Sequence, residues 1–440
     1  MGEIYNLKIS FIRPHISSTP AADAMEPLVF AMLSSYLPGT ITAELYDDRI
    51  ETVPLNLETD LVVMTVETYT AKRAYRFADT FRSKGIPVIM GGYHPTFLPD
   101  EALEHADAVV VGDSEDIWLS IISDYEKGQL KKIYRSTNTH SLSGIVPDRS
   151  LFIGKKYTPI SLVQFGRGCQ YACDFCSIYS FYGNKNLRQR PIKDVVREIE
   201  SLDSKLVFIV DDNLFIDRKT TMNFIEALIP LNIKWSCQAS IDIGADSEML
   251  ELMQKSGCFN TLIGFESLNP KNLAQMHKKW NLKYGGYNDV VKRIHDNGIL
   301  IYATFIFGYD EDTPDSFEPT LEFAIENKFL LANFNPLTPM PGATLYDRIR
   351  KEKRLIFDKW WLDPNFKYGD ATFIPKNMTP DELTEGCFSV RKKFNSYSNI
   401  LKRATNRRTN SQSLRHLGMY SLANLVSRKE IYNKQSISLG

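Results

Sequence analysis

The sequence lacks the long apolar run that a membrane-spanning segment needs. In this sequence of 440 residues, no apolar stretch approaches the ~20 consecutive residues required to cross a bilayer. The first segment has no basic stretch followed by an apolar run, because Arg13 and Asp23 interrupt its apolar residues. We therefore expect a cytoplasmic protein.

The sequence also lacks an excess of charge. Its 52 Lys and Arg residues nearly balance 53 Asp and Glu residues, so no global field indicates nucleic-acid binding. The distribution is uneven, since residues 391–440 contain eleven basic residues and one acid, Glu430. Aromatic residues and leucines alternate with these cations. The segment either contacts an anionic lipid, a phosphate or a redox partner, or forms a solvated amphipathic helix pair.

Paired cysteines of the kind that bind structural zinc are missing, although the chain has six cysteines. Three of them, Cys169, Cys173 and Cys176, form a Cys-x3-Cys-x2-Cys motif. Thiolates are preferred ligands of iron–sulfur clusters and of zinc. Three thiolates in one loop can hold three corners of a [4Fe–4S] cluster and leave the fourth iron open. The alternatives are unligated thiols, or a zinc site whose fourth ligand is one of the remaining cysteines, Cys237, Cys258 and Cys387.

Residues 1–130 alternate between predicted strands and helices. Continuous apolar strands joined by helices are typical of a parallel sheet with helices on both faces. This pattern predicts a five-stranded, doubly wound, Rossmann-like α/β domain. Its strands are predicted at 8–12, 42–46, 60–66, 87–90 and 108–111, and its helices at 27–36, 71–84, 100–103 and 115–126.

A polar stretch, residues 131–158, has no sustained periodicity and is predicted to be a linker. Six further β/α units follow in residues 159–345, which favours a (β/α)6 partial TIM barrel. Residues 346–440 are predicted to form a helical, basic C-terminal region. The barrel strands are predicted at 160–165, 206–210, 234–239, 261–265, 301–307 and 329–335.

The cysteine motif, with Phe175 directly before its last cysteine, resembles the signature of radical S-adenosylmethionine (radical SAM) enzymes. Residues 90–96 and 106–115 resemble the fourth and fifth strand turns of the cobalamin-type domain that precedes the barrel in the B12-binding-domain class. The resemblance covers nearly the whole chain. It implies that the three cysteines hold a [4Fe–4S] cluster, that SAM binds the open iron, and that an electron from the cluster cleaves SAM to give a 5′-deoxyadenosyl radical.

The resemblance also implies which residues line the cofactor site. Polar groups at successive strand ends would contact SAM, since the carboxyl ends of barrel strands carry active sites. Two of these assignments have a structural alternative: a helix cap for the Asp-Asp-Asn triplet, and a solvated or salt-bridged carboxylate for Glu266. The implied cofactor-binding residues are Phe175, Asp211, Asp212, Asn213, Gln238, Ser240, Glu266 and Gly308.

Cobalamin is an open question at this level. Some cobalamin domains use the histidine of an Asp-x-His-x-x-Gly motif as the lower cobalt ligand, and this sequence has no such motif. His94 is a weak candidate ligand and is favoured as a residue that positions a turn. Cobalamin therefore remains an optional third cofactor.

The expected function is a radical SAM enzyme that functionalises an unactivated carbon, by methylation or rearrangement, in a natural-product, lipid or cofactor precursor. The alternative is hydrogen abstraction without cobalamin, as in a dehydratase, dehydrogenase or cyclase whose B12-type domain is vestigial. A non-catalytic iron–sulfur or cobalamin carrier is disfavoured, because a carrier does not need acceptor groups at successive strand ends. A small-molecule substrate, an electron donor such as flavodoxin or ferredoxin, and a monomeric state are expected.

Overall fold

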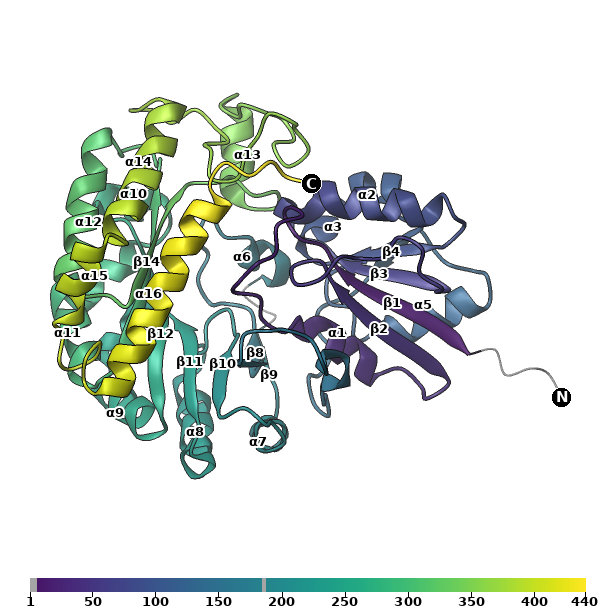
Figure 1. Cartoon of the computed structure of the whole chain (residues 1–440), viewed down its shortest axis with the longest axis horizontal. Helices are drawn as coiled ribbons and strands as arrows, with labels where there is room; N and C mark the ends of the chain where they lie inside the picture. The colour runs from purple at the N-terminus through teal and green to yellow at the C-terminus, as the bar shows by residue number, and fades with distance from the viewer. Residues whose placement is uncertain (1–5, 184–186) are drawn as a thin grey trace. The chain divides into compact units, whose positions relative to one another are not determined.

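The computed structural model describes residues 6–183 and 187–440, which divide into two compact units (Figure 1). Unit 1 contains Met1–Pro159, Lys359–Phe366 and Ser438–Gly440, and unit 2 contains Ile160–Asp358 and Lys367–Ile437. The expectation that 346–440 forms one region is therefore wrong. The short segment Lys359–Phe366 belongs to unit 1 because Trp360 and Trp361 are fully buried there, with Trp360 packed on Tyr69.

Unit 1 is built on a six-stranded parallel sheet with the order β2-β1-β3-β4-β5-β6. Five of these strands were expected. The strands are β1 (Leu7–Arg13), β2 (Ile41–Asp47), β3 (Leu61–Thr65), β4 (Val88–Gly91), β5 (Ala108–Val111) and β6 (Ile133–Arg135).

The sixth strand, β6, corrects the prediction that residues 131–158 are a linker. It pairs with β5, and Tyr134 is buried. Leu142, Ile145 and Leu151 in the same stretch are also buried. The strand was missed because its three residues are too few to show an alternating pattern.

The helices of unit 1 follow from one-sided apolar patterns. In α2 the side chains of Ala74, Ala78 and Phe81 recur every three or four residues and are buried, so they share the face that packs on the sheet. The helices are α1 (Leu28–Ser35), α2 (Ala71–Arg82), α3 (Tyr93–Phe97), α4 (Pro99–His105) and α5 (Trp118–Glu126), with 3-10 turns η1 (Thr68–Thr70) and η2 (Arg149–Phe152).

Unit 2 is also built on a six-stranded parallel sheet, with the order β14-β13-β12-β11-β10-β7. Each strand pairs with the next of these strands along the chain, and the outer strands β7 and β14 do not pair with each other in the part of the chain described here. All six strands were expected. They are β7 (Ser161–Val163), β10 (Leu206–Ile209), β11 (Lys234–Ala239), β12 (Cys258–Glu266), β13 (Leu300–Phe307) and β14 (Leu331–Pro336).

Helices connect these strands, and a small antiparallel ribbon, β8 (Gly166–Arg167) with β9 (Arg188–Gln189), follows β7. Aromatic residues fill much of the core: the ring centroids of Phe165 and Phe224 stack at 4.1 Å. The helices are α6 (Ser177–Tyr182), α7 (Ile192–Glu200), α8 (Arg218–Leu228), α9 (Ser247–Lys255), α10 (Pro270–Gln275), α11 (Tyr287–Asp296), α12 (Phe317–Glu326), α13 (Thr344–Lys351), α14 (Pro380–Phe394), α15 (Tyr397–Ala404) and α16 (Leu414–Lys434), with 3-10 turns η3 (Ile229–Leu231), η4 (Ile241–Ala245), η5 (Lys279–Tyr284) and η6 (Pro314–Ser316).

The last helix, α16, is drawn in yellow in Figure 1 and packs near β14 and α14. Fully buried Arg403 of α15 fixes this packing, because its guanidinium donates to the carbonyls of Phe329 and Leu330 and to the side chain of Asn424. Burial lowers the pKa of Arg403 to about 10. Every helix in residues 6–183 and 187–440 is too short or too polar to span a bilayer.

Candidate functional site

The three clustered cysteines lie together in the segment between β8 and α6. Cys169, Cys173 and Cys176 are half-buried, whereas the other three cysteines of the chain are buried. Burial raises the pKa of Cys173 to about 12 and that of Cys176 to about 11. These groups are therefore thiols in the protein alone, and a bound metal would be needed to hold them as thiolates.

The spacing of the sulfur atoms favours a cluster over a single zinc ion. Among the described residues, the one group of three ligand atoms within 4.8 Å of one another is formed by Asp113, Glu115 and His140, so the three cysteine sulfurs stand further apart. Sulfur ligands of one tetrahedral zinc ion, each about 2.3 Å from the metal, would be closer than this.

Two carboxylates that follow β10 accept hydrogen bonds from backbone amides just before the cysteines. The Oδ1 of Asp211 accepts a hydrogen bond from the Phe165 amide at 2.7 Å, and the Oδ2 of Asp212 accepts one from the Gly168 amide at 2.8 Å. Burial raises the pKa of Asp211 to about 8. The expected helix-cap alternative is wrong, because Asp217 is the residue that caps α8, by accepting from the Thr220 amide.

The amide and hydroxyl groups expected at the ends of β10 and β11 lie close to Cys169. Asn213 donates to the Oγ of Ser240 at 3.1 Å, and its Nδ2 lies 3.9 Å from the Sγ of Cys169. Gln238 donates to the carbonyl of Asp211 at 3.3 Å. Side chains from β10 and β11 thus converge beside the first cysteine.

Glu266 ends β12 in an unusual backbone conformation. Its φ of 62° is in the left-handed region, and the pairing of β12 with β13 shifts register between Gly264 and Glu266. Such strain and bulges concentrate at functional sites. An ideal Cβ at Gly264 would lie 2.0 Å from the Glu266 carboxylate, so a side chain at this position would displace Glu266.

The partner of Glu266 is Lys278, which the sequence analysis did not identify. Lys278 Nζ lies 2.8 Å from Glu266 Oε1 and donates to the Gly264 carbonyl at 2.8 Å, and both side chains are 8% exposed. Burial acts to lower the pKa of Lys278, but the charge of Glu266 and the hydrogen bond to it outweigh burial and raise the pKa. In the sequence the residue is one of two adjacent lysines, a pattern typical of solvated side chains. Only the fold shows that one of them is buried beside the cysteines.

Aromatic residues also contact the cysteine segment. Tyr171 stacks on Trp280 with ring centroids 3.7 Å apart, and its hydroxyl donates to Asp242 at 2.8 Å. Phe175 packs against the core of unit 2.

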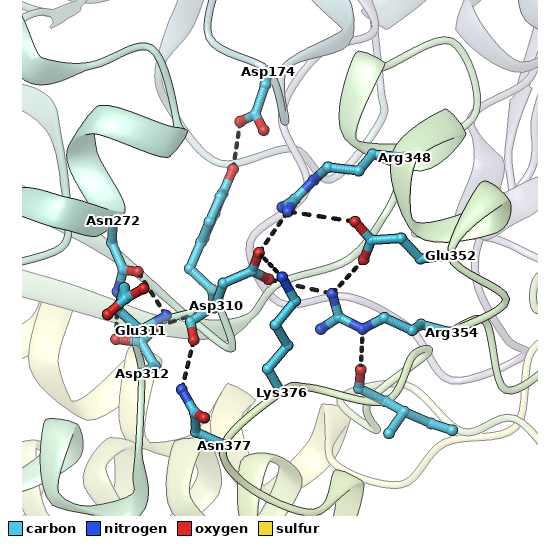
Figure 2. A network of polar contacts seen from close by, with 12 residues as sticks. Asp174, Asn272, Asp310, Glu311, Asp312, Arg348, Glu352, Arg354, Lys376 and Asn377 are labelled. Atoms are coloured by element: carbon cyan, nitrogen blue, oxygen red, sulfur yellow. Dashed lines mark hydrogen bonds and ion pairs between the residues drawn. The ribbon is translucent and has the colours of Figure 1, made fainter.

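A polar network that follows β13 also contacts the cysteine segment (Figure 2). The Tyr309 hydroxyl donates to Asp174, between two of the cysteines, at 2.5 Å. The next residue, Asp310, binds Arg348 at 2.7 Å, Lys376 at 2.6 Å and Arg354 at 3.2 Å. Sequence reasoning missed this network because residues that bond to each other in it are up to 135 residues apart in the chain.

Gly308, which was expected near the cofactor, is explained by packing in this structure. Its φ is +106°, and a Cβ would lie 2.8 Å from Leu383 of α14. Its amide donates to Asp312 at 3.0 Å. Glycine is needed at this position because α14 comes too close for a side chain.

In unit 1, the candidate cobalt ligand His94 is fully buried and engaged through both ring nitrogens. Its Nδ1 lies 3.3 Å from the hydroxyl of Thr68, and its Nε2 lies 3.0 Å from Tyr75 and 3.1 Å from Glu101. Trp361 also donates to Glu101, at 2.8 Å. His94 thus positions the turn after β4, as the sequence favoured.

Comparison with known protein families identifies a match. The model of the Radical SAM superfamily matches residues 163–324, which include the cysteine segment and the strands that surround it.

Two curated relatives match over most of the chain. The bacteriochlorophyllide d C-12(1)-methyltransferase of Chlorobaculum tepidum is 32% identical, over 86% of this chain and 84% of that protein. The anaerobic magnesium-protoporphyrin IX monomethyl ester cyclase of Rubrivivax gelatinosus is 26% identical, over 86% of this chain and 75% of that protein.

Two solved structures share the fold. The radical S-adenosylmethionine methyltransferase TsrM from Kitasatospora setae has a TM-score of 0.65 at 16% identity and covers 78% of this chain and 76% of its own. The cobalamin-dependent S-adenosylmethionine radical enzyme OxsB has a TM-score of 0.66 at 14% identity and covers 97% of this chain and 72% of its own.

Proposed function

This chain belongs to the radical SAM enzymes of the B12-binding-domain class, and we propose that it methylates an unactivated carbon of a small, amphipathic precursor molecule. It is an enzyme of a family that uses a [4Fe–4S] cluster and SAM. Its relatives in the same class are named as methyltransferases and cyclases that act on tetrapyrroles. A natural-product, lipid or cofactor precursor of similar size is the proposed substrate class.

The observation that carries the proposal is the arrangement around the cysteine segment. Carboxylates that follow β10 accept hydrogen bonds from the Phe165 and Gly168 amides, and Tyr309, which follows β13, donates to Asp174 within the segment. A positioned loop with three half-buried thiols is what an iron–sulfur cluster with one open iron requires. When bound, the cluster supplies the electron that cleaves SAM. The chain's own part is to hold the loop, orient SAM and exclude water from the site.

We assign the contacts to SAM to the polar groups nearest these cysteines. The Asn213 amide, the free lone pairs of Ser240 and the Glu266 carboxylate are suited to the amino and hydroxyl groups of SAM. Lys278 would balance the carboxylates of the site and hold Glu266 in its strained conformation. Gln238 and Asp212 would support this arrangement, and Asp211, bonded to the loop's backbone, is assigned to the loop instead.

Unit 1 is assigned as the B12-binding-type domain, with 159–345 as the radical SAM barrel and the remaining C-terminal residues as its helical cover. The proposed third cofactor is cobalamin bound without a histidine ligand from this chain, because His94 is engaged by Glu101 and Tyr75. An electron donor such as flavodoxin or ferredoxin, a monomeric state and a contact of 391–440 with an anionic lipid or phosphate complete the proposal.

The optical spectrum of anaerobically reconstituted protein, with and without added cobalamin, tests the assignment. We expect iron–sulfur absorption, retained cobalamin bands after gel filtration, and transfer of a labelled methyl group from SAM to an acceptor. Iron–sulfur absorption and SAM cleavage without retained cobalamin would favour the alternative, a cobalamin-independent dehydratase, dehydrogenase or cyclase. Absence of both iron–sulfur absorption and SAM cleavage would refute the proposal as a whole.

A further inference from the structure

The surface formed by α15 and α16 exposes an unusual number of large apolar side chains. Fourteen such side chains are exposed in the described part of the chain, and half of them lie between residues 397 and 432. Single exposed leucines are ordinary, but a concentration of them marks an interaction surface. We call this set the leucine face; its members are Tyr397, Leu401, Leu414, Leu417, Leu422, Leu425 and Tyr432.

The helical spacing puts most of these residues on one side of α16. Leu414, Leu422, Leu425 and Tyr432 are separated by steps of three or four residues or their sums, so they share a stripe along the helix. Leu414 is 89% exposed and Leu422 is 65% exposed. The core of unit 2 therefore does not account for these side chains.

The opposite side of α16 is fixed to unit 2. Tyr420 is buried and donates to the Ile400 carbonyl at 2.7 Å, and Asn424 is fully buried against Arg403. The helix cannot roll its leucines inward without breaking these buried bonds. The leucine face is thus held facing outward.

Cations surround the leucine face. Lys402, Arg407, Arg415 and Lys429 are exposed, and none of them forms an ion pair with another residue in the described ranges. Arg428 lies over the rings of Tyr397 and Tyr432, at 4.6 and 5.5 Å from their centroids.

Residues 391–440 carry little negative charge of their own, although Arg408 pairs with Asp296 of α11 and Lys393 pairs with Glu318 of α12. The single acid after residue 390, Glu430, is buried and pairs with Lys434 at 3.0 Å. The leucine face is therefore both apolar and positively charged.

We propose that the leucine face binds the surface of an anionic lipid bilayer. Leucines that protrude from a helix and are flanked by unpaired cations suit insertion between lipid headgroups, and the two tyrosines suit the polar boundary of the bilayer. A protein partner fits less well, because the energetically important residues of protein interfaces are enriched in Trp, Tyr and Arg and depleted in Leu. The helix would lie along the surface and would not cross it.

The first test removes apolar contact. Full-length protein is sedimented with vesicles of phosphatidylglycerol and phosphatidylcholine in equal amounts. We expect Leu422→Ser combined with Leu425→Ser to weaken binding by roughly tenfold or more, which corresponds to ~1.4 kcal/mol. The control pair, Leu55→Ser with Leu119→Ser, changes leucines of unit 1 with similar exposure and should bind like the unchanged protein.

The second test removes charge. We expect Arg415→Gln and Lys429→Gln each to weaken binding about fivefold, or ~1 kcal/mol for each cation near the bilayer. Lys127→Gln and Lys219→Gln, at exposed positions elsewhere, are the controls and should have no effect. Raising the salt concentration should weaken binding of the unchanged protein, and vesicles of phosphatidylcholine alone should bind weakly.

Each other result overturns the proposal. No binding to the mixed vesicles, equal binding to vesicles without anionic lipid, or full binding by both sets of variants would do so. An acidic protein that binds this face while vesicles do not would identify a different occupant. Thermal unfolding of every variant shows that the fold is unchanged, and SAM cleavage is measured separately, so failure here is distinct from failure of the proposed function.

Discussion

The two parallel sheets of this protein differ in what the polar residues at their carboxyl edges contact. At the carboxyl edge of the unit 2 sheet, Asp211, Asp212 and Asn213 turn toward a loop of half-buried thiols. At the corresponding edge of the unit 1 sheet, His94 is closed in by Glu101 and its neighbours. The lesson is that the architecture places polar groups at strand ends, while the partners of those groups decide whether a ligand can reach them.

The largest expected effect concerns the cysteines, all six of which belong to unit 2. Replacing Cys169, Cys173 or Cys176 by Ala should abolish the iron–sulfur cluster and SAM cleavage, because each supplies one of three thiolates to the cluster. The controls Cys237→Ala, Cys258→Ala and Cys387→Ala remove buried cysteines and should retain the cluster. Iron and sulfide content after anaerobic reconstitution measures both sets. Equal cluster loss in a control variant would mean that the ligands are assigned wrongly.

The second prediction compares a buried ion pair of unit 2 with a partly exposed one of unit 1. Lys278→Met leaves the Glu266 charge buried and unpaired, which should cost about 3–5 kcal/mol in the free energy of unfolding. Lys359→Met should cost at most ~1 kcal/mol, because Lys359 is 53% exposed and Glu101 keeps its bonds from His94 and Trp361. Denaturant unfolding gives both values.

SAM binding should depend on residues beside the cysteines of unit 2 and not on the ion pair of unit 1. Glu266→Ala or Asn213→Ala should weaken SAM binding by roughly 10- to 150-fold, since a hydrogen bond to a charged group contributes about 1.5–3 kcal/mol. Lys359→Met is the control and should bind SAM normally. Calorimetric titration of reconstituted protein measures these affinities. Unchanged affinity in both site variants would show that SAM contacts other residues.

The next prediction concerns the pH at which a group in each unit loses its contribution to stability. Burial lowers the pKa of His295, in unit 2, to about 4, so the unfolded chain takes up a proton that the folded chain does not as the pH falls from about 6.5 to 4. The contribution of His295 to stability is lost in that window, by up to roughly 3 kcal/mol. His295→Asn should flatten this dependence in thermal unfolding.

In unit 1 the corresponding loss of stability occurs at lower pH and comes from Glu101. Burial raises the pKa of Glu101, but hydrogen bonds from His94, Trp361 and Lys359 outweigh burial and lower the pKa to about 2. Its contribution is complete above about pH 4.5 and is lost as the pH falls toward 2. The stability loss that His295→Asn removes should therefore occur at higher pH than the loss that Glu101→Gln removes, and the reverse order would contradict this assignment.

The smallest expected effect concerns the network in Figure 2. Tyr309→Phe removes the hydrogen bond to Asp174 and should speed loss of iron from the cluster about fivefold, which corresponds to ~1 kcal/mol. Tyr420→Phe removes an equally buried hydroxyl bond far from the cysteine segment and should leave iron retention unchanged. Iron release to a chelator measures the rates, and equal rates in the two variants would show that Tyr309 does not position the loop.

Much of the fold could be predicted because its signals are local. The six strands of unit 2 are apolar runs with helical patterns between them, and the three cysteines are close together in the sequence. The short strand β6 and the segment Lys359–Phe366 could not be predicted, since each is stabilised by contacts with distant residues. The sequence also does not show that α14 packs against Gly308, whose assignment to the cofactor site stays a prediction.

The sequence by itself determined most strands of the two α/β sheets, the clustered cysteines and the strand ends that meet beside them, because periodicity and spacing are properties of short stretches of chain. Only the tertiary structure decided that Lys278 is buried against a strained Glu266, that His94 is engaged on both nitrogens, and that α16 turns its leucines to solvent. These features depend on which distant residues share a buried volume. Burial and charge pairing are set by that packing, and no local pattern encodes them.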